Sequence, residues 1–214
     1  MNKNKAKTII DRLAPLYPDK PALNYGSNYQ LLVAVILSAQ CTDERVNKVT
    51  EKLFLDYPTP EKMITLSVDE LGKKIFSCGL YKSKAEHILK MSGDIINKYA
   101  GEVPSNYDDL LSLAGVGRKT ANVVYSVAFG GDAIAVDTHV FRVSNRIGLA
   151  KSNSVLTVEK QLTTILARNV WSKAHHYLIY HGRRVCFARN PDCVNCPIND
   201  LCENPVSTQS KAKK

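Results

Sequence analysis

The chain has 214 residues, enough to bury a substantial core as one domain or as two small ones. Its formal net charge of +9 and its pI near 9.2 favour a polyanionic partner, but they do not separate DNA from RNA or an acidic membrane surface. No apolar run is long enough to span a bilayer and no signal-peptide core follows Met1, so we expect a cytoplasmic protein without a membrane partner.

Apolar spacing and turn signals predict helices throughout the N-terminal half. A first amphipathic helix is expected over 7–16, where Pro18 stops it. Residues 31–37 are apolar on every face, which is typical of a helix surrounded by other helices. Gly101 is expected to close a long amphipathic helix. Four further helix starts are predicted from their capping residues: Thr42 or Asp43, Thr59-Pro60, Ser67 with Glu70, and Ser83 with Glu86.

The C-terminal half continues the helical pattern. A short helix is expected to start at Ser105-Asn106-Tyr107-Asp108, and others after Thr138, over 158–166 and over 171–181. The apolar segment 133–136 is too brief for a helix. Because no segment alternates convincingly as a strand and no internal repeat is present, the sequence predicts an all-α fold.

A glycine-rich turn divides the chain near its middle, in Leu113-Ala114-Gly115-Val116-Gly117-Arg118-Lys119. Gly115 and Gly117 can adopt the positive φ of a tight turn and let a ligand approach the backbone. The helix that follows presents free N–H groups and a positive dipole end, which attract a phosphate. Two glycines alone are more often ordinary turn punctuation, but the preceding short helix makes this a helix-hairpin-helix pattern. We therefore predict DNA contacts from Gly115, Val116, Gly117 and Arg118.

The six cysteines fall into two groups, and in a reducing compartment they do not predict a disulfide framework. Cys41 and Cys78 stand alone and are predicted to be small buried hydrophobes. The other four follow the spacing Cys186-x6-Cys193-x2-Cys196-x5-Cys202, and four-cysteine sites occur for both zinc and iron-sulfur. Zinc sites usually show two close pairs, whereas only Cys193 and Cys196 form one here.

These features together resemble the endonuclease III family of DNA glycosylase/AP lyases, over essentially the whole length of the chain. The family pattern at the turn is Leu-Pro-Gly-Val-Gly, with Ala114 here in place of the proline. The resemblance implies a two-lobed helical fold, with one lobe over 21–129 and the other formed by 1–20 and 130–206. It implies DNA across the cleft between them and a 4Fe-4S cluster on the four cysteines. Residues 207–214 are predicted to be a disordered tail.

Lys119 is the candidate nucleophile. An isolated lysine is ordinarily a solvated surface residue, but positive potential from the helix start and from Arg118 favours the neutral, nucleophilic amine. The resemblance implies that this amine attacks C1′ of the damaged nucleotide, expels the base and forms a Schiff base, after which β-elimination cleaves the strand 3′ to the site. Asp137 precedes Thr138 as a good N-cap, and the same carboxylate can serve proton transfer or stabilise positive charge on the sugar.

Other predicted DNA contacts follow from base extrusion and from charge. The gap that an extruded nucleotide leaves must be filled, and the resemblance nominates Gln40 and Leu80, although an ordinary amide and a core leucine are equally simple readings. His139 resembles a family DNA contact or is an ordinary residue of a helix start. Arginines near the cysteine loop are expected to meet phosphates: Arg183, Arg184 and Arg189.

The leading hypothesis is a monomeric enzyme that excises oxidised pyrimidines from damaged double-stranded DNA at the nucleoid. A mismatch-specific glycosylase of the same superfamily is one alternative. A non-catalytic helix-hairpin-helix DNA-binding module with a structural metal is the other, and the presence of Lys119 with Asp137 argues against it.

Overall fold

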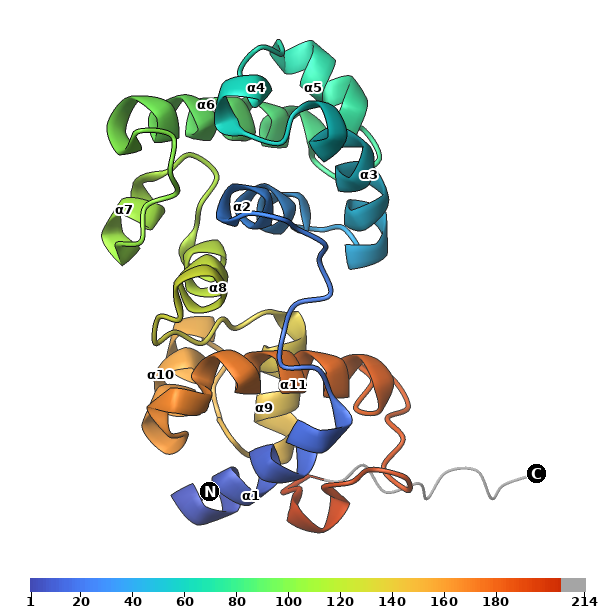
Figure 1. Cartoon of the computed structure of the whole chain (residues 1–214). Helices are drawn as coiled ribbons and strands as arrows, with labels where there is room; N and C mark the ends of the chain where they lie inside the picture. The colour runs from blue at the N-terminus through green and yellow to red at the C-terminus, as the bar shows by residue number, and fades with distance from the viewer. Residues whose placement is uncertain (205–214) are drawn as a thin grey trace, which may run out of the picture. The chain divides into compact units, whose positions relative to one another are not determined.

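The computed structural model describes residues 1–204, so the predicted tail over 207–214 lies outside them. Each regular element within this range is a helix, which confirms the all-α prediction (Figure 1). The backbone divides into two compact units, one formed by Ala22–Gly131 and the other by Met1–Pro21 together with the chain from Asp132 onward. No helix among residues 1–204 is both long enough and apolar enough to cross a membrane.

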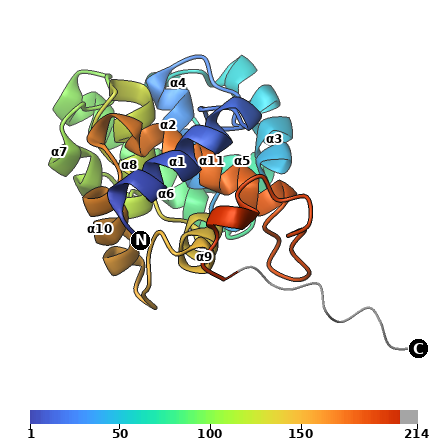
Figure 2. The ribbon, with the colours of Figure 1, turned by 90° about the horizontal axis from the view of Figure 1, so that it is seen from below.

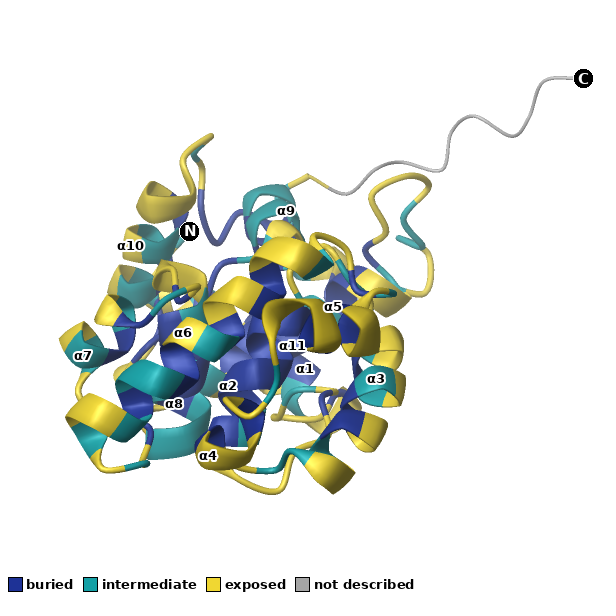
Figure 3. Ribbon diagram, turned by 90° about the horizontal axis from the view of Figure 1, so that it is seen from above, coloured by how far each residue is buried: buried dark blue, intermediate teal, exposed yellow. Residues whose placement is uncertain are grey.

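The Ala22–Gly131 unit is built around α2, which covers Asn28–Leu37. Eight of its ten residues are buried, as its apolar run predicts, and it packs against α3, α6 and α8 (Figure 3). Around it the chain forms these helices: α3 (Asp43–Asp56), α4 (Pro60–Met63), α5 (Val68–Ile75), α6 (Tyr81–Tyr99), α7 (Tyr107–Ser112) and α8 (Arg118–Phe129).

Helix starts in this unit follow the predicted caps with two exceptions. Thr42, Thr59 and Ser67 each accept a hydrogen bond from the first turn of the next helix, and Ser67 with Glu70 forms a full capping box. The predicted capping box of Ser83 with Glu86 is wrong, because α6 begins two residues earlier at Tyr81. At α7 the capping side chain belongs to Asn106, which accepts from two backbone N–H groups, and not to Ser105.

The other unit begins with α1 (Lys3–Leu13), followed by a 3₁₀ turn, η1 (Ala14–Leu16). The predicted helix over 7–16 therefore starts too late, because Asn2 caps α1, and it runs past the true end of the α-helix before Pro15. The unit continues with the following elements: α9 (Thr138–Ile147), α10 (Val155–Ile165), η2 (Arg168–Val170), α11 (Trp171–Arg184) and η3 (Asn199–Leu201).

One hydrophobic core joins these elements. Ile9 and Leu13 of α1 are fully buried with Val140 and Val143 of α9 and with Leu178 of α11. Figure 2 shows α1 lying across α11, with which it packs. The apolar segment 133–136 is buried in the same unit and leads directly into α9. This core fixes the start of α9, where one of the two predicted catalytic residues lies.

Candidate functional site

The turn between α7 and α8 holds two glycines with different geometry. Gly115 has φ of 77°, and a Cβ built on it would lie 2.8 Å from Cβ of His87, so only glycine fits there. Gly117 has φ of −87°, which any residue adopts, so the predicted positive φ is wrong at this position. A Cβ built on Gly117 would meet nothing within 4 Å. The turn is therefore closely packed at Gly115 and has open space beside Gly117.

The open side leads to the start of α8. Gly117 is the N-cap residue and has no side chain to accept the first N–H groups, which otherwise lack intrahelical partners. Arg118 and Lys119 are exposed at this helix start, whereas Val116 is buried and its N–H donates to the Leu113 carbonyl at 3.1 Å. The backbone and two cations thus surround a place suited to an anion.

Aromatic contacts hold α7 against α8. The Tyr107 hydroxyl donates to Oδ1 of Asn122 at 2.5 Å, and the Tyr107 ring meets the Tyr125 ring edge-on at 5.5 Å between centroids. A Cβ built on Gly131 would lie 2.2 Å from the Tyr125 ring, so glycine is required there too. Our sequence reasoning did not identify these residues. Asn122, a polar residue among the apolar positions of α8, was the available signal.

Asp137 caps α9. Its Oδ1 accepts a hydrogen bond from the Val140 N–H at 2.7 Å, so the predicted capping role is confirmed. The segment before it is buried, and the Ala135 carbonyl lies 2.7 Å from Nδ1 of His175 on α11. Asp137 is half-buried at the end of this fixed segment. Lys119 belongs to the Ala22–Gly131 unit and Asp137 to the other.

The four clustered cysteines lie after α11 on one loop, and none of the four is joined in a disulfide. Cys186 is buried and the other three are half-buried. Burial raises the pKa of Cys196, and the charges of Cys186, Cys202 and Cys193 raise it further. Among residues 1–204, no three His, Cys, Asp or Glu side chains converge closely enough to hold a single metal ion. A cluster assignment therefore depends on the spacing of the four cysteines along the loop.

Two arginines of α9 support this loop, and we did not identify them from the sequence. Arg146 donates to the Phe187 carbonyl at 2.6 Å and to Sγ of Cys186 at 3.5 Å. Arg142 donates to the Gly182 carbonyl at 2.9 Å and to the Cys186 carbonyl at 3.1 Å. Their spacing of four residues places both on one helix face, which was a usable signal.

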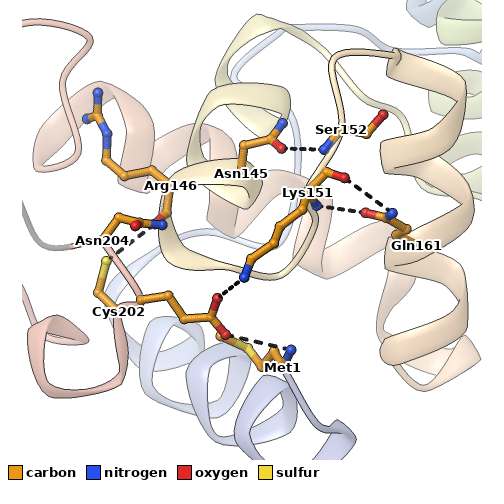
Figure 4. A network of polar contacts seen from close by, with 9 residues as sticks. Met1, Asn145, Arg146, Lys151, Ser152, Gln161, Cys202 and Asn204 are labelled. Atoms are coloured by element: carbon orange, nitrogen blue, oxygen red, sulfur yellow. Dashed lines mark hydrogen bonds and ion pairs between the residues drawn. The ribbon is translucent and has the colours of Figure 1, made fainter.

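The far end of the loop is held by an ion-pair network (Figure 4). Glu203 lies 3.6 Å from the N-terminal ammonium of Met1 and 3.0 Å from Nζ of Lys151. The hydrogen bond from Lys151 lowers the pKa of Glu203 below its usual range. Sγ of Cys202 donates to the Arg146 carbonyl at 3.6 Å, as Figure 4 also shows. Both ends of the cysteine loop thus contact α9.

The two predicted gap-filling residues are exposed and share an unusual backbone conformation. Gln40 has φ of 54° and Leu80 has φ of 60°, values that non-glycine residues rarely adopt. Leu80 is 59% exposed, so it is not the core leucine of the simpler reading. Strain at exposed turns is frequent at functional sites. Their contact with DNA stays a prediction.

The remaining predicted contacts differ in their surroundings. Arg183, Arg184 and Arg189 are exposed. Arg184 lies over the ring of Tyr180 at 5.2 Å and over that of Tyr17 at 5.9 Å, so part of its surface is already used. His139 is half-buried, with Nδ1 3.3 Å from the Arg142 guanidinium.

Comparison with protein families gives two matches. Residues 33–168 match a family described as HhH-GPD superfamily base excision DNA repair protein. Residues 186–202, from the first to the last clustered cysteine, match the iron-sulfur binding domain of endonuclease III. Endonuclease III of Haemophilus influenzae is 50% identical over 204 residues, which are 95% of this chain and 97% of the relative. Endonuclease III of Bacillus subtilis is 48% identical over 213 residues, 99% and 97% of the two chains.

Solved structures agree with these matches. A trapped endonuclease III–DNA covalent intermediate has a TM-score of 0.90 and 48% identity, covering 96% of this chain and 97% of that one. A thermostable thymine-DNA glycosylase has a TM-score of 0.84 at 27% identity, covering 94% and 96%. The chain therefore belongs to the endonuclease III family of HhH-GPD base excision DNA repair proteins, and it is a DNA glycosylase and AP lyase with a 4Fe-4S cluster.

Proposed function

We propose that this enzyme excises oxidised pyrimidines from duplex DNA, with Lys119 as the nucleophile and Asp137 as its acid–base partner. The observation that carries the proposal is the position of Lys119, which is exposed in the first turn of α8 directly after the open side of the glycine turn. A DNA phosphate bound at this helix start would bring the sugar of a neighbouring nucleotide within reach of the amine.

The reaction follows from an amine at C1′. The Lys119 nitrogen forms a bond to C1′, the glycosidic bond breaks, and the base leaves with a proton. Opening of the sugar ring then gives an imine between Lys119 and C1′, with the ring oxygen protonated to a hydroxyl. Loss of a proton from C2′ and cleavage of the C3′–O bond complete β-elimination, and water releases the lysine.

Asp137 is suited to the proton transfers in this sequence. Its Oδ1 is engaged by the Val140 N–H, which fixes the carboxylate at the start of α9. An ionised carboxylate near the sugar can accept a proton from the lysine ammonium, which leaves the neutral amine to attack C1′, and can stabilise developing positive charge. Capping and catalysis are compatible, because a carboxylate has two oxygen atoms.

DNA binding in the proposal combines phosphate contacts with filling of the base stack. The backbone at Gly115 and Gly117, with Arg118, would hold one phosphate, and the exposed Arg183 and Arg189 would meet others. Leu80 and Gln40 project from exposed turns and would occupy the gap that the extruded nucleotide leaves.

The cluster is held by Cys186, Cys193, Cys196 and Cys202 in this proposal. When bound, it cross-links the loop after α11 and supplies no chemistry to base excision. Arg142 and Arg146 of α9 support the same loop, because they donate to the Cys186 and Phe187 carbonyls. We further infer that the protein acts as a monomer in the cytoplasm, associated with the nucleoid through DNA.

Oxidised pyrimidines are favoured over mismatched bases for two reasons. The endonuclease III relatives are close to half identical to this chain, whereas the thymine-DNA glycosylase is 27% identical. A ring-saturated pyrimidine also stacks poorly, so it costs less to extrude than an intact base. An amine nucleophile removes such a base without an activated water.

Single-turnover excision on matched duplexes at one salt concentration tests the proposal. We expect fast excision and nicking of thymine glycol and dihydrouracil, and slow action on thymine opposite guanine and on adenine opposite 8-oxoguanine. An undamaged duplex is the control. Faster processing of the thymine mismatch than of thymine glycol would replace the proposal by the mismatch-specific alternative.

A further inference from the structure

The two cysteines outside the cluster lie on neighbouring turns of the Ala22–Gly131 unit. Cys41 follows the end of α2, and Cys78 lies between α5 and α6. Cys78 is fully buried as predicted, but Cys41 is only half-buried, so its prediction as a buried hydrophobe is wrong. An interaction with Cys41 helps to raise the pKa of Cys78, so the two side chains lie near each other. Sequence positions far apart thus form a thiol pair.

The backbones of the two turns are also in contact. A Cβ built on Gly79 would lie 3.1 Å from the Gln40 carbonyl oxygen, and a disulfide requires such a close approach of its two chains. Lys84 of α6, which follows the Cys78 turn, bonds the backbone just before Cys41. Its Nζ, in a residue only 4% exposed, donates to the Leu37 carbonyl at 2.8 Å and to the Ala39 carbonyl at 2.6 Å. These contacts hold the turn that carries Cys41 close to the turn that carries Cys78.

We propose that Cys41 and Cys78, on two turns in close contact, are a site of reversible oxidation, at which a peroxide converts the two thiols to a disulfide that links the turns. The Cys41 thiolate attacks one oxygen of hydrogen peroxide, giving a sulfenic acid and hydroxide. The Cys78 sulfur then attacks the sulfenic sulfur, the S–S bond forms, and the hydroxyl leaves as water with the Cys78 proton. In sum, two thiols are oxidised and one peroxide is reduced to two waters.

Exposure and charge assign the two roles within the pair. Cys41 is the member that solvent reaches, so it meets the peroxide first. Burial, and to a smaller extent the interaction with Cys41, raises the pKa of Cys78 to about 11, and the positive charges of Lys84 and Arg45 oppose this rise. Cys78 therefore stays a thiol and acts second, on the sulfenic acid beside it. A thiol of high pKa reacts slowly, so the link forms under peroxide and not at rest.

The link would change how two exposed residues move. Gln40 is adjacent to Cys41, and Leu80 follows Cys78 by two positions, so the disulfide covalently joins the turns that carry them. The consequence for catalysis rests on the proposed function. If these residues enter the base stack, fixing their turns should lower the excision rate several-fold, and a reducing agent should restore it.

Peptide mapping of the full-length, cluster-containing protein tests the oxidation site. After brief peroxide treatment that leaves the visible absorbance of the cluster unchanged, trypsin should release peptides 13–45 and 75–82 joined, with the loss of two hydrogen atoms. Neither peptide contains a clustered cysteine, so the readout is specific to this pair. The joined peptide should disappear with dithiothreitol and in Cys78→Ala, in which dimedone should instead trap a sulfenic acid at Cys41.

Two results would overturn the site: separate peptides after Cys41 has been oxidised, or no oxidation of Cys41 before the cluster absorbance falls. Single-turnover excision on the same samples measures separately whether the disulfide lowers the excision rate. A joined peptide with an unchanged rate keeps the oxidation site and contradicts only the effect on Gln40 and Leu80. A failure of the proposed substrate, by contrast, would show in the untreated enzyme and leave the peptide map unaffected.

Discussion

Gly115 and Gly117 are two residues apart, and glycine is present at each for a different physical reason. Gly115 occupies the left-handed region, and its missing side chain avoids His87. Gly117 has an ordinary φ and open space around it, so the folded backbone alone does not require glycine. A sequence pattern of two glycines cannot make this distinction, because it contains no backbone angle and no neighbour from α6.

The two positions therefore form a matched pair of variants. Gly115→Ala should lower the free energy of unfolding by roughly 1–2 kcal/mol for the left-handed backbone, with the His87 contact adding to it. Gly117→Ala should leave stability within about 0.5 kcal/mol but weaken DNA binding, since its methyl group would fill the side open to phosphate. Urea unfolding and a DNA-binding titration measure the two effects. Equal DNA affinity for Gly117→Ala and the wild type would contradict the phosphate role.

Asp137 tests whether one carboxylate serves both the fold and the reaction. Asn keeps an oxygen that can accept from the Val140 N–H but removes the charge, so Asp137→Asn should fold with near-normal stability. Its single-turnover excision rate should fall by on the order of a hundredfold or more. Asp137→Ala is the control for the cap and should lose about 1 kcal/mol of stability. A near-normal rate for Asp137→Asn would leave only the structural role.

At the scale of elements, helix starts were predictable where one side chain decides them. Thr42, Thr59 and Ser67 cap as predicted because their hydroxyls reach a nearby N–H without help from the rest of the fold. Ser83 fails although it has the same pattern with Glu86. There α6 begins at Tyr81, directly after Leu80 in the left-handed region, so Ser83 lies inside the helix and does not cap its start.

Helix α11 carries a buried histidine that links stability to pH. Burial lowers the pKa of His176 to about 3, with the charge of His175 as a smaller cause, and no partner bonds its Nε2 among the described residues. Below the unfolded pKa of about 6.5, the unfolded chain binds a proton that the folded chain rejects. The contribution of neutral His176 to the free energy of unfolding is therefore fully present above pH 6.5 and is lost as the pH falls towards 3.

His176→Gln should reduce this pH dependence, because glutamine stays neutral. Between pH 7 and pH 5 the wild type should lose about 2 kcal/mol more of its free energy of unfolding than the variant does. Urea unfolding of both proteins at the two pH values measures the difference. An identical loss in both would show that the pKa of His176 is the same in the folded and the unfolded protein.

For the whole molecule, the sequence predicted the all-α fold, the glycine turn and a cluster on four cysteines. Each of these predictions depends on residues close together along the chain. The sequence did not predict the residues that join distant segments. Arg142 and Arg146 support a loop about forty positions further along, and Tyr107 reaches Asn122 across the turn. Such contacts depend on how helices pack, and apolar periodicity fixes the buried face of a helix without naming its partner.

The proposed reaction requires that Lys119 form a covalent imine with DNA. Borohydride reduction during the reaction converts such an imine to a stable amine, so the enzyme should be trapped on a duplex containing thymine glycol. Tryptic mapping of the trapped complex should place the nucleotide remnant on Lys119. Lys119→Gln should bind DNA but give no trapped complex and no strand cleavage. A remnant on another residue, or undiminished trapping by Lys119→Gln, would contradict the claim.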